Sequence, residues 1–296
     1  MDLVYCTELS ASVRLGEAIV WATEVLQAAG CDSPRLDAEL LLANSLGVTR
    51  SQLHVRWRDR LTPAVSTTFY AYIQRRKRRE PLAYILCQRA FYDLVLEVGP
   101  ATLVPRPETE LLVEEAIKWC QRQGERSLWA ADVGTGSGAL AIALARQVPA
   151  LQVCAIDRSG AALEVAERNI LCYGLQDRFR LSVGDLFEGV QRRFDVIVAN
   201  LPYIPRARLA ELAPEVTQYE PIQALDGGES GLEIIEHMCQ QVPAHLERPA
   251  LLLLEIDEGQ GQTVSSLLSS VLPLAQVQVL LDYAGLERAV RAEMVI

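Results

Sequence analysis

The 296-residue sequence lacks any apolar run of the roughly 20 residues needed to cross a bilayer. Apolar runs such as residues 250–254 are far shorter. The amino terminus also lacks the basic region and the following apolar stretch that are typical of a secretory signal. These absences predict a cytoplasmic protein without a membrane-spanning segment.

Paired metal-ligand spacing is missing as well. The three histidines, His54, His237 and His245, form no ligand pattern, so we expect them to be structural or at the surface. The seven cysteines occur singly, at positions 6, 31, 87, 120, 154, 172 and 239. Because an odd, dispersed set is typical of reduced thiols, the sequence predicts a cytoplasmic chain that binds no metal.

The sequence also has no excess of positive charge, since its formal net charge is −10. A general nucleic-acid binder needs a positive surface to release counterions, so we expect no stable nucleic-acid binding. Five basic residues do cluster at 75–79, at the end of a predicted helix. The favoured interpretation is a solvated helix end whose cations complement the helix dipole. The alternative is a docking patch for an acidic protein surface or for RNA.

A glycine-rich loop lies between a predicted strand at 128–133 and a predicted helix at 139–146. Glycines let the backbone turn tightly beside a ligand, and the helix offers unpaired N–H groups at its amino end. A second predicted strand, 152–156, ends at Asp157, whose carboxylate can accept hydrogen bonds from both hydroxyls of a ribose. The predicted cofactor-binding residues of this region are Gly134, Thr135, Gly136, Ser137, Gly138 and Asp157. The loop fits both a nicotinamide dinucleotide and S-adenosylmethionine.

The tetrapeptide at 200–203, which follows a buried strand predicted at 194–199, favours the second cofactor. The side-chain oxygen of Asn200 and an adjacent backbone carbonyl can each accept one hydrogen from a planar NH2 group. A nicotinamide enzyme does not need this grip, whereas a methyltransferase acting on an amide or amino nitrogen does. The acidic turn before it offers Asp185 to an adenine amine and Leu186 to cover the adenine ring. These residues leave both an amide and an adenine acceptor open.

Hydrophobic spacing divides the chain into three parts. Apolar residues at helical spacing predict a helical domain at 1–80, with helices beginning at Ser33-Pro34 and Thr62-Pro63. Short β-like runs at 90–92 and 94–98 predict a hairpin linker at 81–104. Alternating strands and helices over 105–296 predict an α/β domain with a mostly parallel, doubly wound sheet.

Six segments together resemble those of one protein family. They are residues 81–86 (PLAYIL), 105–110 (PRPETE), 132–138 (DVGTGSG), 200–204 (NLPYI), 219–228 (YEPIQALDGG) and 282–288 (DYAGLER). The resemblance is to the PrmC/HemK family, the glutamine methyltransferases of peptide-chain release factors, and it covers nearly the whole chain. It implies a class I S-adenosylmethionine-dependent methyltransferase, Rossmann-like in fold, behind a helical substrate-recognition domain and a β-hairpin linker.

The resemblance also implies methylation of the glutamine side-chain amide in the Gly-Gly-Gln loop of class 1 release factors, which supports translation termination. Asn200, which would also border the cofactor, would accept one hydrogen of the glutamine NH2, and the Leu201 carbonyl the other. Pro202 would shape the turn, and Tyr203 would wall the pocket. Arg106 and Glu108 lie in a segment expected near the site, without an assigned role. The predicted catalytic and substrate-binding residues are Asn200, Leu201, Pro202 and Tyr203.

Three positions depart from the family pattern, with Leu201, Cys87 and Asp257 where the family normally has Pro, Gly and Gly. Because position 201 acts through its carbonyl, we expect Leu201 to be tolerated, at a cost of roughly 0.4 to 1 kcal/mol for the lost restriction of φ. An alternative is an adenine-amine RNA or DNA methyltransferase. RNA adenine dimethylases resemble the chain in this tetrapeptide, but they place the helical domain last. Intact glycines, Asp157 and Asn200 disfavour a non-catalytic adaptor.

Overall fold

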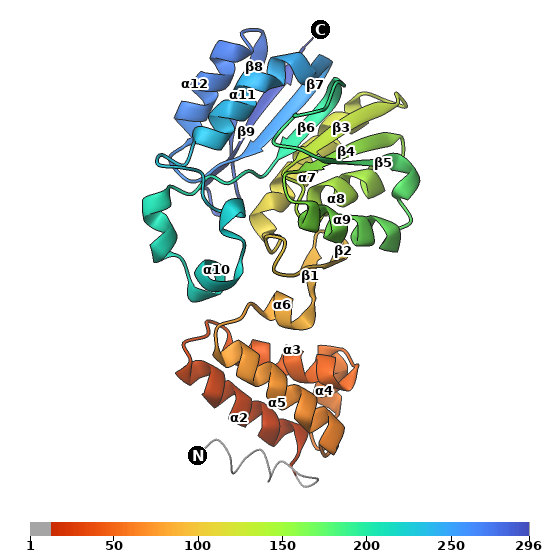
Figure 1. Cartoon of the computed structure of the whole chain (residues 1–296). Coiled ribbons are helices and arrows are strands. Elements are labelled where there is room, and N and C mark those ends of the chain that lie inside the picture. The colour runs from red at the N-terminus through yellow and green to blue at the C-terminus, as the bar shows by residue number, and fades with distance from the viewer. Residues whose placement is uncertain (1–12, 296) are drawn as a thin grey trace. The chain divides into compact units, whose positions relative to one another are not determined.

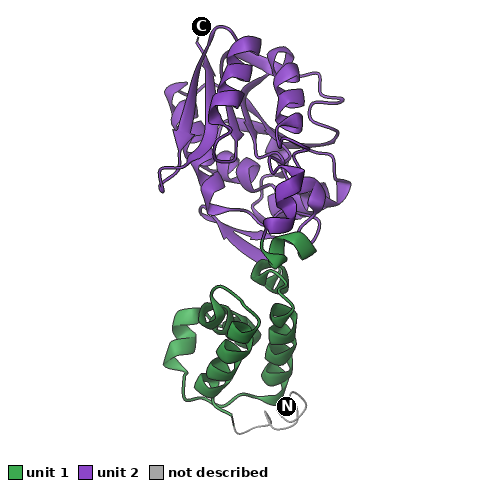
Figure 2. Ribbon diagram, turned by 90° about the vertical axis from the view of Figure 1, so that its left-hand side faces the viewer, with its two compact units in different colours: residues 1–87, 213–219 green, residues 88–212, 220–296 purple. Residues whose placement is uncertain are grey.

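Residues 13–295 are described by a computed structural model and form two compact units (Figures 1 and 2). The helical unit contains the chain up to Cys87 together with residues 213–219, and the α/β unit contains 88–212 and the chain from Glu220 on. This division differs from the expected boundaries at 80 and 104. Ile85 packs into the core of the helical unit, whereas Phe91 and Leu94 of the hairpin pack into the core of the α/β unit.

The helical unit is built from short amphipathic helices. They are α2 (Leu15–Ala28), α3 (Pro34–Leu46), α4 (Arg50–Val55), α5 (Pro63–Lys77), α6 (Leu82–Leu86) and α10 (Pro214–Tyr219). The starts predicted at Ser33-Pro34 and Thr62-Pro63 are confirmed, and the Thr62 side chain accepts a hydrogen bond from the Val65 amide. Leu26, Leu41 and Phe69 are among the buried residues that hold these helices together.

The α/β unit contains a hairpin and a seven-stranded sheet. The hairpin pairs β1 (Gln88–Phe91) with β2 (Leu94–Glu97) in antiparallel register. The sheet strands are β3 (Leu128–Val133), β4 (Leu151–Asp157), β5 (Phe179–Val183), β6 (Phe194–Ala199), β7 (Leu246–Glu255), β8 (Ala275–Leu281) and β9 (Glu287–Met294). Their order is β5-β4-β3-β6-β7-β9-β8, and β9 runs antiparallel to both of its neighbours. The predicted mostly parallel sheet is therefore confirmed.

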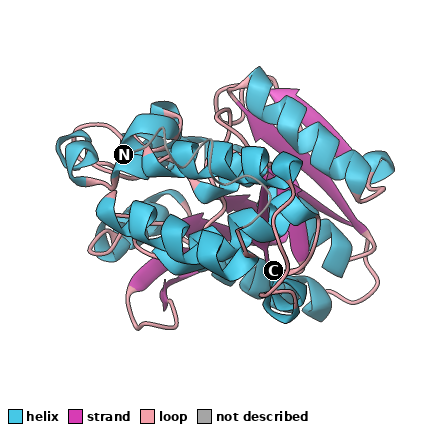
Figure 3. Cartoon of the chain, turned by 90° about the horizontal axis from the view of Figure 1, so that it is seen from below, coloured by secondary structure: helices cyan, strands magenta, loops and turns pink. Residues whose placement is uncertain are grey.

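Helices cover both faces of this sheet (Figures 1 and 3). They are α7 (Glu110–Arg122), α8 (Ala139–Gln147), α9 (Gly160–Cys172), α11 (Glu233–His245) and α12 (Gly261–Val271). Successive strand residues point to opposite faces, so Val196 and Val198 of β6 pack with α7 and α8, whereas Ile197 packs with α11 and α12. In such open sheets a ligand binds beyond the carboxyl ends of the strands, where the strand order reverses. Here this point lies between β3 and β6.

The described residues also show whether this part of the chain contains membrane-spanning helices, metal-binding groups or disulfides. Within 13–295, no helix is long and apolar enough to cross a membrane. In the same residues, no group of three or more His, Cys, Asp or Glu side chains is arranged to hold a metal ion. Six cysteines in this part of the chain are free thiols, and Cys6 lies outside the described residues.

Candidate active site

A cavity in the α/β unit lies beyond the carboxyl ends of β3, β4 and β6. It brings together most of the predicted site residues, namely Arg106, Gly134, Thr135, Gly136, Ser137, Asp157, Asp185, Leu186, Asn200, Leu201 and Pro202. Glu108, Gly138 and Tyr203 do not line it. The cavity therefore lies where the reversal of strand order predicts a ligand site.

The glycine loop at this cavity has a backbone that favours glycine. Gly134, Gly136 and Gly138 have φ values of 76°, 56° and 82°, in the left-handed region. A Cβ added at Gly134 would lie 3.2 Å from the Cδ2 atom of Leu201, whereas one added at Gly136 would meet nothing within 4 Å. The loop thus turns tightly beside position 201 and leaves space open at Gly136.

Asp157 ends β4 and is tied to the glycine loop. Its Oδ2 accepts a hydrogen bond of 2.8 Å from the Gly136 amide, and its Oδ1 accepts one of 2.9 Å from the Ser159 amide. Burial raises the pKa of Asp157, and these two hydrogen bonds oppose the rise. Both oxygens keep further lone pairs with which to accept from a ligand.

Asp132 lies beneath the loop and was not among the predicted site residues. Its Oδ2 accepts from the Thr135 hydroxyl at 2.7 Å and from the Ala141 amide at 3.1 Å. Its Oδ1 is buried without a hydrogen-bond partner among residues 13–295, and Asp132 lines the cavity. Burial raises its pKa to about 7. A buried carboxyl oxygen without a partner is costly unless a ligand supplies the missing donor.

The turn after β5 contributes Asp185 and Leu186 to the cavity wall. Asp185 is exposed, whereas Leu186 is buried and packs with Leu201 in the core on the α11 side of the sheet. Leu186 has a φ of 54°, which is uncommon for a residue with a side chain. The turn therefore presents one carboxylate and one apolar side chain side by side.

Asn200 follows β6 and is held by a residue that the sequence reasoning missed. Its Nδ2 donates a hydrogen bond of 3.1 Å to the hydroxyl oxygen of Thr109, which is buried and also lines the cavity. This contact leaves the side-chain oxygen of Asn200 as an acceptor. Leu201 is 5% exposed, and its side chain lies against Gly134. Thr109 belongs to the PRPETE segment, in which Arg106 and Glu108 were expected to lie near the site. A hydroxyl in the same segment was the signal that could have identified Thr109.

Tyr203 differs from its expected place as a wall of the pocket. Its hydroxyl donates a hydrogen bond of 3.2 Å to Oε1 of Glu255, and its carbonyl accepts one of 2.9 Å from the Gln260 side chain. Glu255 is 1% exposed, and its burial raises its pKa to about 7. Glu255 was also missed, although an acid at the end of a buried strand is the same signal that identified Asp157.

Arg106 and Glu108, which follow one another closely, have different environments. The Arg106 guanidinium lines the cavity and donates a hydrogen bond of 2.5 Å to Oε1 of Glu220. The other oxygen of Glu220 accepts from the Val104 amide at 3.1 Å, which joins the PRPETE and YEP segments. Glu108 is exposed at the start of the 3-10 turn η1 (Pro107–Thr109), as expected for an acidic residue at a helix start.

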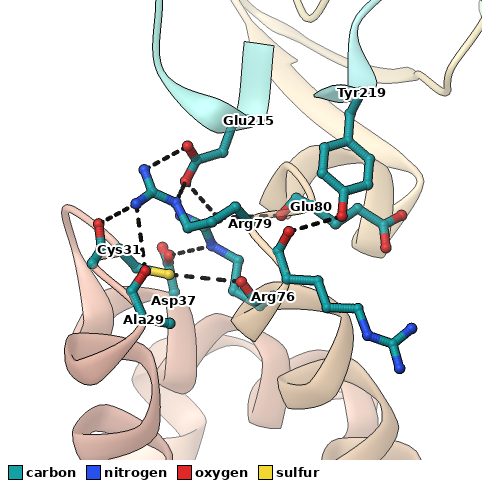
Figure 4. Close-up of polar contacts among 10 residues, drawn as sticks. Ala29, Cys31, Asp37, Arg76, Arg79, Glu80, Glu215 and Tyr219 are labelled. Carbon is teal, nitrogen blue, oxygen red and sulfur yellow. Dashed lines mark hydrogen bonds and ion pairs between the residues drawn. The ribbon is translucent and has the colours of Figure 1, made fainter. Parts of the chain in front are cut away.

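The basic cluster at 75–79 matches neither interpretation fully (Figure 4). Arg76 is buried and donates to Asp37 and Glu215, both at 2.8 Å. Arg79 donates to both oxygens of Glu215 at 2.6 Å, and Arg75 pairs with a neighbouring glutamate. Arg75, Arg76 and Arg79 are therefore engaged by carboxylates inside the helical unit, beyond what a solvated helix end or a docking patch predicts.

Two family models match the chain. Residues 17–86 match the PrmC N-terminal domain, and residues 109–259 match ribosomal protein L11 methyltransferase (PrmA). The catalytic domain of hMettl16, in complex with a MAT2A 3'UTR hairpin, is similar with a TM-score of 0.51 and 12% identity, covering 68% of this chain and 76% of that one. At this identity the likeness shows the fold alone.

Curated relatives align over both units. The release factor glutamine methyltransferase of Geobacter sulfurreducens is 39% identical over 250 residues, which cover 84% of this chain and 86% of the relative. That of Moorella thermoacetica is 40% identical over 280 residues, covering 93% and 97%. Since the matches extend over nearly the full length of these proteins, the chain belongs to the family of release factor glutamine methyltransferases.

Proposed function

We propose that this protein transfers a methyl group from S-adenosylmethionine to the side-chain amide nitrogen of the glutamine in the Gly-Gly-Gln loop of class 1 release factors. The observation that carries the proposal is the placement of Asn200, whose amide donor is taken up by Thr109 within the cavity that also contains the glycine loop. The curated relatives, which are named release factor glutamine methyltransferases, support it.

The residues of the cavity fit S-adenosylmethionine. Asp157 has free lone pairs for ribose hydroxyls, and Asp185 and Leu186 can flank an adenine through its amine and its face. Oδ1 of Asp132 lacks a partner and can accept from the ammonium group of the cofactor. The open space at Gly136 lets the cofactor approach the backbone. When bound, the cofactor supplies the electrophilic methyl group.

The acceptor site must orient a poor nucleophile, because the lone pair of an amide nitrogen is delocalised. The side-chain oxygen of Asn200 and the carbonyl of Leu201 each accept one hydrogen of the glutamine NH2, which fixes the nitrogen beside the methyl donor. Holding reacting atoms in such an orientation can lower the barrier by several kcal/mol, roughly 7 to 11 in the best cases. Pro202 stiffens the turn, and the Leu201 side chain lies against Gly134 of the glycine loop.

The helical unit, with the match at 17–86, is the natural place for recognition of the release factor. Methylation of this loop supports translation termination, which takes place in the cytoplasm, so the proposed substrate also implies a cytoplasmic location. The net charge of −10 favours a protein acceptor over nucleic acid.

The proposal is tested with labelled S-adenosylmethionine and four separate acceptors: a release factor, its loop Gln→Ala variant, ribosomal RNA and ribosomal protein L11. L11 is included because residues 109–259 match a family named after its methyltransferase. We expect label on the release factor alone. The Asn200→Ala variant should lose most of this activity. Label on RNA or L11, or label that survives the Gln→Ala change, would overturn the proposal.

A further inference from the structure

A buried threonine hydroxyl and a buried carboxyl group lie behind Asn200. Asn200 donates from Nδ2 to Thr109 Oγ1 at 3.1 Å, and the Thr109 hydroxyl is near enough to Glu255 to lower the pKa of its carboxyl. The Tyr203 hydroxyl donates to Oε1 of the same glutamate. Thr109 is 4% and Glu255 1% exposed, so water does not compete for these contacts.

Strand register explains why these distant residues meet. In the parallel pair β6 and β7, Ala199 is opposite Leu254, so Asn200 and Glu255 are the next residues on adjacent strands. Thr109 ends the turn η1 and begins α7, which packs on the same sheet. Three segments separated by many residues thus converge on one side-chain amide.

The hydrogen bond between Asn200 and Thr109 fixes the orientation of the amide. Nδ2 of Asn200 is the donor and Oγ1 of Thr109 is the acceptor. Since Nδ2 is the donor of the Asn200 amide, its oxygen is left for another partner. Arg288, held by Asp282 at 3.1 Å, lowers the pKa of Glu255, whereas Glu108 raises it.

We propose that Thr109 is a positioning residue that locks the side-chain amide of Asn200 with its oxygen presented to the acceptor NH2 group. This inference rests on the proposed function and specifies how the acceptor is held. Tyr203 contributes to the same region, because its hydroxyl donates to the buried carboxyl of Glu255.

The first test reads the Asn200 amide without any turnover. The sequence has three asparagines, Asn44, Asn169 and Asn200, so a protein labelled with ¹⁵N-asparagine gives few side-chain NH2 signals. The Asn200 pair is assigned by its loss in Asn200→Ala. Thr109→Val should shift this pair and speed its exchange with water, while the Asn169 pair, donated to two backbone carbonyls, stays in place. Thr109→Ser should keep the wild-type signals.

The second test reads catalysis. Thr109→Val should lower kcat by roughly 10- to 100-fold, since misplacement of a catalytic contact has effects of this size. The KM for S-adenosylmethionine should change by less than about twofold, because the lost contact does not bind the cofactor. Thr109→Ser should restore most of kcat. Combined with Asn200→Ala, Thr109→Val should cause no further loss, as expected for residues that act through one another. The exposed Thr263→Val is the matched control.

The outcomes separate the two proposals. A wild-type protein that methylates no release factor refutes the proposed function, and the NMR comparison still decides whether Thr109 holds Asn200. Wild-type Asn200 signals in Thr109→Val would overturn the positioning inference at any level of activity. Shifted signals with unchanged kcat, or additive losses in the double variant, would overturn it as well.

Discussion

The buried arginine Arg76 gives the sharpest test of the helical unit. Its side chain is 7% exposed and donates to Asp37 and Glu215, whose side chains are 8% and 14% exposed. Replacing it by methionine keeps most of the side-chain volume but removes the cation from Asp37. Glu215 keeps Arg79, which donates to both of its oxygens. The perturbation therefore leaves one buried carboxylate without its cation.

The expected cost at neutral pH is about 3 to 5 kcal/mol, the size seen when one partner of a buried ion pair is removed. Burial already raises the pKa of Asp37, and Arg76 is the main influence that lowers it. Without Arg76 the folded-state pKa rises further above the unfolded value, so folding loses stability as pH rises through it. The cost of Arg76→Met should therefore shrink as pH falls toward 5. The double variant Asp37→Leu with Arg76→Met should recover most of the loss.

The assay is hydrogen exchange of the α5 and α10 amides in the full chain, which reports the opening free energy of the helical unit separately from the α/β unit. Arg56→Met is the control, because Arg56 pairs with Asp59 and the two side chains are 43% and 50% exposed. An exposed pair of this kind contributes about 0 to 1 kcal/mol. A loss in Arg76→Met no larger than that in the control, or a double variant as unstable as the single one, would refute the argument.

Four other substitutions test individual positions. Arg78 is exposed, so Arg78→Glu examines docking without breaking the Arg76 contacts, and an unchanged KM for the release factor would exclude docking at this side chain. Leu201→Pro should lower the free energy of unfolding by about 1 kcal/mol through lost packing. Its turnover should stay within about tenfold of the wild type. A change in turnover of several decades would contradict the idea that position 201 acts through its backbone carbonyl. Cys87→Gly should raise the free energy of unfolding by about 0.5 to 1 kcal/mol, because Cys87 has a φ of 56°; an unchanged denaturation midpoint would contradict this. Glu255, with a pKa of about 7, binds its proton more tightly in the folded than in the unfolded state, so the free energy of unfolding of the wild type should fall from pH 5 to 7. Glu255→Gln should make this fall less steep, by up to about 1.4 kcal/mol per pH unit. Parallel stability profiles of the two proteins would contradict this prediction.

Local patterns predicted the elements well because each pattern has a direct backbone cause. Alternating strands and helices gave the parallel sheet, and Ser or Thr before proline marked two helix starts. The glycine loop and the acid ending β4 were placed at one cavity because carboxyl ends of parallel strands share an edge of the sheet. These inferences need no knowledge of distant contacts.

The rest depended on pairings between segments far apart in the sequence. Glu220 binding Arg106, or Thr109 binding Asn200, follows from register and packing that no local pattern encodes. The buried use of Arg76 was hidden for the same reason, since its partner Glu215 is 139 residues away. From the sequence alone, a run of cationic residues is expected to be solvated. Only the fold shows the carboxylates that pair with the buried Arg76.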